Sequence, residues 1–320
     1  MASIKLKIKL FLKAIFHKII PSKNLKNKLL KFFGRDYELN ESELSKIENI
    51  NLSNIDSKKG DFIVSLTTFP ARIHTLKYTL YSIFMQNLVP KKVILSLSSQ
   101  EFENKILPDE ILEFQKYGLE ILWNDKNLYQ YNKIIPTLKK YGNEVIITID
   151  DDVFYPQGLL KGLFESYLKN KNVVWTQRAR IINLINNKVD SFSTWKLVKK
   201  NDFKNQENPR FDLFLEGVGG VLYPPNSLYK DVIDDEKFMK LSPKADDLWL
   251  FAMAILNGTK IAVVKNNLMA NGNAMTISPH NKASLWLNNL INGNDKQLKS
   301  IIDYYPNVLE ILKSTKKEGL

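Results

Sequence analysis

Cysteine is absent from the 320 residues of this chain. Disulfide bridges, thiolate nucleophiles and Cys-ligated zinc are therefore excluded, and the composition fits a reducing compartment. Histidine occurs only as His17, His74 and His280, so a metal site built from several histidines is not expected. Any bound metal would depend on oxygen ligands, which Mg²⁺ and Mn²⁺ prefer.

Acidic residues are missing from the start of the chain, where none precedes Asp36. Residues 1–35 contain nine lysines and one arginine, so the formal charge of +12 is concentrated at this end. On a helical wheel the apolar side chains of residues 4–19 form one stripe opposite Lys5, Lys9 and Lys13. We expect residues 1–33 to be a basic amphipathic helical segment that lies on an anionic membrane surface. A solvated helix packed on its own domain remains the alternative, and the alternation of Ile4–Leu10 also fits a strand.

Long apolar runs are missing as well. No uncharged apolar run approaches the ~20 residues that span a bilayer. Lys13 and Lys18 interrupt the run that a signal peptide requires, and no small-residue cleavage site follows it.

Hydrophobic residues make up 44% of the whole chain, and the part that follows the basic segment shows alternating strand and helix patterns. Asn40–Lys59 is polar and reads as a linker or short helix. After it the expected strands are "DFIVSLTTF", "KKVILSLSS", "LEILWND", "EVIITID", "NVVWTQRARII" and "TKIAVV". The expected helices are "RIHTLKYTLYSIFMQ", "DEILEFQKYG", "YNKIIPTLKKYG", "PQGLLKGLFESYLKN" and "ADDLWLFAMAILNG". Such alternation predicts an α/β fold built from right-handed βαβ units with a parallel sheet.

Three adjacent carboxylates end the strand in "VIITIDDDVFYP", as Asp150, Asp151 and Asp152. Ligands of open α/β sheets gather outside the carboxyl ends of the strands. Packed carboxylates are costly there unless a cation neutralises them, and a divalent ion that bridges a diphosphate does so. A solvated acidic turn is the structural alternative.

The stretch "VIITIDDDVFYP" resembles the DxD-bearing strand end of GT-A glycosyltransferases that use nucleotide sugars. The segments "DFIVSLTTFPARI", "NKIIPTLKKYG", "EGVGGVLYPP" and "ADDLWL" resemble further parts of bacterial capsule and lipopolysaccharide transferases of this type, in the same order. The resemblance covers roughly Asp61–Val264. It implies a GT-A, Rossmann-like mixed sheet flanked by helices. The implied division is a basic segment and linker over 1–58, a catalytic domain over 59–270 and a C-terminal tail with helices over 271–320. The catalytic domain would comprise a nucleotide-binding half, 59–156, and an acceptor half, 157–270.

The same resemblance implies roles for the residues on the donor side. Asp152 would bind Mn²⁺ or Mg²⁺ most directly, Asp150 would face the metal or the ribose, and Asp151 would contact donor hydroxyls. The metal would offset charge on the departing nucleoside diphosphate. The other matching positions are Thr67, Thr68 and Phe69 beside the nucleobase, and Arg72 and Lys133 beside the diphosphate or base. Ordinary surface cations are the alternative interpretation of Arg72 and Lys133.

On the acceptor side, inversion needs a base near the attacking hydroxyl. Asp247 is the preferred base and Asp246 the second choice. The alternative is that Ser242, Asp246 and Asp247 cap a helix and complement its dipole, which leaves open a retaining enzyme that needs no base. Glu216 would bond an acceptor hydroxyl, while Gly217, Gly219 and Gly220 would let the backbone approach the acceptor closely. A tight turn without a ligand also explains these glycines. His280 would complete the metal shell, although a lone histidine is more often structural.

The sequence therefore predicts a metal-dependent glycosyltransferase that moves a sugar from a nucleotide donor, in the first place a UDP-sugar, to a capsule or lipopolysaccharide glycan. Its expected place is the inner face of the bacterial cytoplasmic membrane, as a peripheral protein. A nucleotidyltransferase acting on sugar phosphates is the second hypothesis, although "SLTTFPARI" lacks the Gly-rich phosphate loop such an enzyme would carry. A nucleic-acid-binding protein ranks last, because the lysines gather on one terminal segment, and no nucleic-acid partner is expected.

Overall fold

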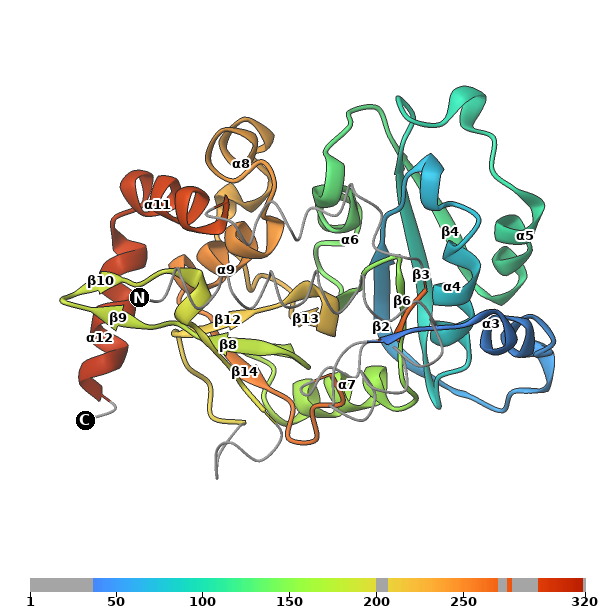
Figure 1. Cartoon of the computed structure of the whole chain (residues 1–320), viewed down its shortest axis with the longest axis horizontal. Helices are drawn as coiled ribbons and strands as arrows, with labels where there is room; N and C mark the ends of the chain where they lie inside the picture. Colours follow the sequence, from blue (N-terminus) through green and yellow to red (C-terminus); the bar gives the residue numbers. More distant parts are fainter. Residues whose placement is uncertain (1–36, 200–206, 270–274, 278–292, 319–320) are drawn as a thin grey trace, which may run out of the picture.

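A seven-stranded sheet forms the centre of the computed structural model, which describes residues 37–199, 207–269, 275–277 and 293–318 (Figure 1). Its strand order is β14-β7-β13-β5-β2-β3-β4. Six strands run parallel, and β13 runs antiparallel to both of its neighbours, β5 and β7. The strands are β2 (Lys58–Leu66), β3 (Leu88–Ser98), β4 (Leu119–Asn124), β5 (Ile146–Thr148), β7 (Val173–Thr176), β13 (Val221–Tyr223) and β14 (Lys260–Val263). The expected α/β class with a mixed sheet is confirmed.

Helices cover both faces of this sheet, because its strands carry apolar side chains on both sides. One core joins the sheet to α4, α5 and α7, and the other joins it to α6, α9, α11 and α12. Thus successive residues such as Val174 and Trp175 belong to different cores. The helices are α3 (Glu41–Glu48), α4 (Leu76–Phe84), α5 (Asp109–Leu112), α6 (Ile135–Tyr141), α7 (Leu159–Lys169), α8 (Asp235–Leu241), α9 (Asp246–Leu256), α11 (Asn294–Tyr304) and α12 (Asn307–Glu318).

Smaller sheets flank the central one. The first has the order β1-β15-β6 and connects segments that are distant in sequence, namely β1 (Tyr37–Glu38), β15 (Met275–Thr276) and β6 (Val153–Phe154). The second has the order β11-β8-β12, with β8 (Ala179–Ile181), β11 (Lys196–Leu197) and β12 (Leu213–Leu215). A short hairpin pairs β9 (Leu184–Ile185) with β10 (Lys188–Val189).

Two segments differ from the sequence prediction. "NVVWTQRARII" is not one strand, because the chain leaves the central sheet after Thr176 and enters the β11-β8-β12 sheet at Ala179. "EGVGGVLYPP" is more than a turn: after a short 3₁₀ turn, Gly217–Gly219, it supplies the buried strand β13. The apolar run Val221–Tyr223 explains this, since a fully buried strand needs apolar side chains on both faces.

The two predicted halves of the catalytic domain both contribute strands to the central sheet. Strands β2 to β5 come from residues 59–156, except that β2 begins one residue earlier, at Lys58. Strands β7, β13 and β14 come from residues 157–270. The polar stretch after Asn40 contains α3, whose start is closed by a capping box between Asn40 and Glu43. The predicted amphipathic segment, residues 1–33, lies outside the described residues.

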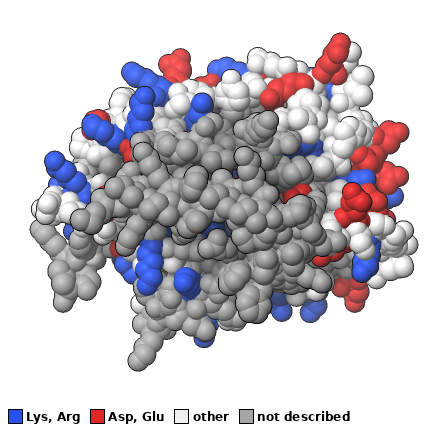
Figure 2. All heavy atoms as spheres, viewed as in Figure 1, with Lys and Arg blue, Asp and Glu red and all other residues white. Residues whose placement is uncertain are grey.

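The charged side chains of the described surface are unevenly distributed. In Figure 2 the acidic side chains gather toward the end of the molecule where Figure 1 labels α3 and α5. Lysine and arginine side chains are scattered around the described rim in this view. Among the described residues, no helix is long and apolar enough to cross a membrane.

Candidate active site

The acidic run follows β5 directly, at the carboxyl edge of the parallel strands. Residues Thr67 and Thr68 follow the neighbouring strand β2 at the same edge. This is where open α/β sheets place their ligands. The sequence prediction for the position of Asp150–Asp152 is thus met by the strand order.

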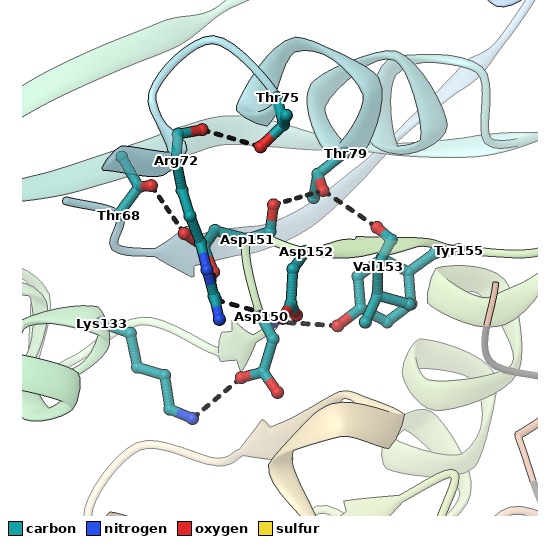
Figure 3. Close-up of polar contacts among 10 residues, drawn as sticks. All are labelled: Thr68, Arg72, Thr75, Thr79, Lys133, Asp150, Asp151, Asp152, Val153 and Tyr155. Carbon is teal, nitrogen blue, oxygen red and sulfur yellow. Dashed lines mark hydrogen bonds and ion pairs between the residues drawn. The ribbon is translucent and has the colours of Figure 1, made fainter. Parts of the chain in front are cut away.

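Asp151 is the most deeply buried of the three aspartates, with 6% of its surface exposed. Its Oδ2 accepts a hydrogen bond of 2.6 Å from Thr68 Oγ1, and its Oδ1 accepts one of 2.8 Å from Arg72. Figure 3 shows this side chain turned toward Thr68 and Arg72. Burial raises the pKa of Asp151, while the guanidinium of Arg72 opposes that rise. In this geometry Asp151 fastens the loop after β2 to the end of β5.

Asp152 shares the same arginine, with 3.1 Å between Arg72 Nη1 and its Oδ2. Burial raises the pKa of Asp152 to about 7, Arg72 acts against the rise, and repulsion from Asp151 and Asp150 adds to it. One cation therefore serves two neighbouring carboxylates. The raised pKa means that burial and repulsion together outweigh the stabilisation that Arg72 gives to the ionised form.

Asp150 points away from its two neighbours, toward Lys133 (Figure 3). Lys133 Nζ lies 3.1 Å from Asp150 Oδ1. The backbone amide of Asp150 donates to the hydroxyl of Tyr155 at 2.9 Å. Because Tyr155 is fully buried, this bond fixes the direction in which the strand leaves the sheet.

Lys133 connects the acidic run to the start of α9. Its Nζ lies 2.8 Å from Asp246 Oδ2 and 4.0 Å from Asp247 Oδ1. The residue is buried at the end of a 3₁₀ turn, Tyr129–Lys133, which contacts β2 and β3. The structure thus brings the predicted donor-side and base residues together around one ammonium group.

Asp247 is held by the backbone of the glycine-rich turn. The amide of Gly217 donates to Asp247 Oδ2 at 2.8 Å. Burial raises the pKa of Asp247 to about 8, repulsion from Asp246 adds to the rise, and Lys133 opposes it. A carboxylate with this pKa is well matched to proton transfer near neutral pH.

A purely capping role does not account for these two aspartates. The N-cap of α9 is Ala245, which makes no side-chain cap bond, and Asp246 and Asp247 lie in the first turn. Their charges complement the helix dipole there. Nevertheless, their side chains contact Lys133 and Gly217, which belong to other elements.

The predicted acceptor residues are engaged within the protein. Glu216 accepts from Arg178 Nε at 2.9 Å and from Arg180 Nε at 2.7 Å. A Cβ atom at Gly219 would lie 2.5 Å from Arg178 Cβ, and Gly220 has a φ of 83°. Packing and backbone conformation therefore already require these two glycines, as the turn interpretation predicted.

The predicted nucleobase loop is partly open to solvent. Phe69 has 37% of its surface exposed, and Arg72 lies over its ring at 5.3 Å from the centroid. Thr67 is half-buried. Of the three predicted nucleobase residues, Thr67 and Phe69 leave their side chains accessible to a ligand, whereas Thr68 is committed to Asp151.

The acidic residues can be tested against two kinds of metal site: one built from protein ligands alone, and one completed by the phosphates of the substrate. In the described part of the chain, no three His, Asp or Glu side chains converge on one metal position. Yet five aspartates share Arg72 and Lys133, and Asp150 and Asp152 keep 30% and 21% of their side chains exposed. Mg²⁺ and similar ions are commonly held by one or two carboxylates together with substrate phosphates. The residues therefore fit a metal that binds with a diphosphate. The predicted ligand His280 lies outside the described residues.

Sequence reasoning missed several groups that build this site. They are the Gly217 amide, the Tyr155 hydroxyl, and Thr79 Oγ1, which donates to the carbonyls of Asp151 and Val153. A buried tyrosine just after the acidic run was the only local signal for any of them. The others depend on contacts between distant parts of the chain.

A separate cavity of about 280 Å³ lies between α3, α4 and the turn that follows α5. Its lining includes Glu48, Lys77, Glu110, Tyr81 and Phe114. None of the aspartates described above lines this cavity.

Comparison with known proteins gives fold similarities only. No protein-family model and no curated protein matches the sequence. In structure the chain is similar to TarS 1–349 from S. aureus, with 15% identity, a TM-score of 0.40 and coverage of 64% of this chain and 58% of that one. The chain therefore spans less than two thirds of the TarS structure.

Two further solved structures are similar. The mannosyltransferase PcManGT from Pyrobaculum calidifontis, in complex with GDP-Man and Mn²⁺, shares 12% identity with a TM-score of 0.48, covering 81% of this chain and 69% of its own. UTP-bound UGPase from Acinetobacter baumannii shares 12% identity with a TM-score of 0.35, covering 78% of this chain and 93% of its own. Because these identities and TM-scores are low, the function is inferred below from the side chains of this chain.

Proposed function

We propose that this protein is a metal-dependent glycosyltransferase that uses a nucleotide sugar and inverts the anomeric centre. The observation that carries the proposal is the grouping of Asp150, Asp246 and Asp247 around Lys133 at the carboxyl edge of a parallel sheet, with Asp152 held nearby by Arg72. Two carboxylates that could take a metal therefore lie near Asp247, whose pKa of about 8 suits a base.

On the donor side, Asp150 and Asp152 would hold Mn²⁺ or Mg²⁺ together with the diphosphate of the donor. When bound, such an ion neutralises charge on a departing nucleoside diphosphate. Thr67 and Phe69 would edge the nucleobase, for which uridine is our first choice. Arg72 keeps Asp151 and Asp152 in place and carries positive charge at the mouth of the site.

On the acceptor side, Asp247 would take the proton from the attacking hydroxyl. The hydroxyl oxygen then bonds to the anomeric carbon from the face opposite the diphosphate, and the old carbon–oxygen bond breaks with its electron pair on the phosphate oxygen. A pKa of about 8 favours Asp247 as this base, because a weaker acid gives a stronger conjugate base. The Gly217 amide keeps one oxygen of Asp247 engaged, so that the carboxylate has a fixed orientation.

The acceptor in this proposal is a bacterial surface glycan, of capsule or lipopolysaccharide type, carried on a membrane lipid. The one-sided charge of residues 1–33 supports it, since a basic amphipathic segment is attracted to anionic lipid. The protein would then work as a peripheral protein at the inner face of the cytoplasmic membrane.

The decisive experiment is a transfer assay with a panel of UDP-, GDP- and CMP-sugars, with and without Mn²⁺. We expect metal-dependent release of a nucleoside diphosphate with one member of the panel. A parallel incubation with UTP and sugar 1-phosphates tests for nucleotidyl transfer. Pyrophosphate release in that arm, with no sugar transfer in the first, would overturn the proposal.

Variants assign the activity to this site. Asp152→Asn and Asp247→Asn should each lower turnover by about 100-fold or more, because each removes several kcal/mol of stabilisation from the transition state. Asp61→Asn is the matched control, since the side chain of Asp61 is 84% exposed near the start of β2. The control should keep wild-type turnover.

A further inference from the structure

We propose that Lys133 is a positioning residue that fixes the base carboxylates relative to the donor-side Asp150, and that it does not bind the donor diphosphate. This inference rests on the proposed glycosyl transfer. It departs from the sequence prediction, in which Lys133 would meet the diphosphate or the base of the donor.

The contacts of Lys133 come from separate elements of the fold. Asp150 follows β5, and Asp246 and Asp247 begin α9. Lys133 itself is supplied by the turn that follows β4. One ammonium group therefore ties the edge of the central sheet to the helix that carries the base.

The surroundings of the Lys133 ammonium leave little room for a phosphate. Lys133 has only 6% of its surface exposed. A Cβ atom at Gly217 would already lie 3.0 Å from Lys133 Nζ. An ammonium has three N–H donors, and carboxylate oxygens lie at 2.8 and 3.1 Å with a third at 4.0 Å. One donor is hydrogen-bonded to Asp150 Oδ1, and carboxylate oxygens of Asp246 and Asp247 face the ammonium as ion-pair partners.

Removing this cation would leave Asp150, Asp246 and Asp247 facing one another without compensation. Like charges at this separation repel strongly in a buried site. Asp150 keeps its place through the bond from its backbone amide to Tyr155, whereas Asp246 and Asp247 would move away from it or gain protons. Either change displaces the base from the acceptor hydroxyl. A displacement of about 1 Å at a catalytic group can cost about 100-fold in rate.

The inference predicts that nucleotide affinity and turnover respond differently to changes at Lys133. Lys133→Met should lower kcat by about 100-fold at saturating donor. The Kd for UDP with Mn²⁺, measured by calorimetry, should change by less than about threefold, because the side chain does not contact the nucleotide. Lys133→Arg keeps the charge and should recover part of kcat with the same Kd.

The control is Lys126→Met, which removes an exposed lysine of the same connection that pairs with Asp235. It should leave both kcat and Kd at wild-type values. Thermal unfolding of each variant reports whether the fold is kept, and if Lys133→Met does not fold, the charge-conserving Lys133→Arg carries the comparison alone. A kcat below wild type at unchanged Kd would then support the inference.

The contrary result is a nucleotide Kd weakened at least tenfold in a folded Lys133 variant, with kcat at saturating donor close to wild type. That outcome would show that Lys133 contacts the donor nucleotide, as the sequence predicted, and it would not affect the glycosyltransferase proposal. Failure of the proposed function is seen separately, as a wild-type protein that binds no nucleotide and transfers no sugar.

Discussion

The backbone amide of Gly217 donates a 2.8 Å hydrogen bond to Oδ2 of Asp247. The contact is so close that no side chain fits at residue 217. A Cβ at Gly217 would lie 2.7 Å from Asp247 Oδ1 and 3.0 Å from Lys133 Nζ. The carboxylate of Asp247 therefore packs directly against the backbone of Gly217, and a side chain at residue 217 would overlap with this carboxylate.

Gly217→Ala should consequently lower kcat by about 100-fold, because the added methyl group displaces Asp247. We expect a loss of about 1–3 kcal/mol in the free energy of unfolding from overpacking. Gly258→Ala is the control: Gly258 has a φ of 76° and open space around its Cβ position. It should cost about 1 kcal/mol of stability without lowering kcat. Equal turnover in both variants would contradict the assignment of Asp247.

The pH dependence of catalysis should follow the state of Asp247. Only the ionised carboxylate can accept a proton, and burial raises its pKa to about 8. We therefore expect kcat/KM to rise with pH up to about 8 and then to level off, with roughly a tenfold loss per unit below. Asp247→Asn should abolish this limb along with most of the activity. A flat profile between about pH 6 and 9 would exclude Asp247 as the base.

The strand and helix that carry the site could be predicted because each is encoded by a short, continuous stretch of sequence. The apolar residues of β5 predict a strand, and the acidic run begins one residue after its end, so the position of Asp150 at the sheet edge follows from the pattern. The start of α9 at Asp246 was equally readable from "ADDLWLFAMAILNG". The C-terminal pairing of β15 with β1 and β6 carried no comparable signal.

The partners of the charged groups could not be predicted in this way. Lys133 and Asp246 are far apart in sequence, and only the packing of the Tyr129–Lys133 turn against the sheet brings them to 2.8 Å. Glu216 was expected to face an acceptor, yet Arg178 and Arg180 occupy its oxygens. Both arginines belong to the stretch where one expected strand divides between two sheets, which periodicity alone does not reveal.

Thr68 should matter more for stability than its neighbour Thr67. Its hydroxyl donates to the buried carboxylate of Asp151 at 2.6 Å, and Thr68→Val would leave that oxygen without this donor. We expect a loss of about 2 kcal/mol in the free energy of unfolding, measured with urea at neutral pH. Thr67→Val should cost less than about 0.5 kcal/mol. Similar losses in the two variants would argue against the role given to Asp151.

Glu120 on β4 gives a pH-dependent contribution to stability at a site remote from the acidic run. Burial disfavours its charge, but hydrogen bonds from Lys140, Tyr141 and Lys92 outweigh burial and lower its pKa to about 2, from an ordinary 4.5. Because the folded-state pKa is the lower one, this stabilisation is present above pH 4.5 and is lost as the pH falls toward 2. Glu120→Gln should cost about 1 kcal/mol at pH 7, and the difference from wild type should shrink in acid.

The control for this measurement is Glu165→Gln, which removes an exposed i,i+4 partner of Lys161 at 3.7 Å. It should change stability by less than about 0.5 kcal/mol at every pH. A Glu120→Gln deficit that persists undiminished at low pH would mean that lost packing, and not lost charge, causes it.

The basic segment, residues 1–33, is expected to bind the protein to membranes. Deleting Met1–Phe33 should release the protein from liposomes that contain anionic lipid, because each lysine near such a surface contributes about 1 kcal/mol. Activity on a soluble acceptor should persist, since the described sheet and the acidic site begin after this segment. Neutral liposomes are the control and should bind neither form. Sedimentation of the truncated protein with anionic liposomes would show that another surface makes the contact, and the role proposed for residues 1–33 would then be wrong.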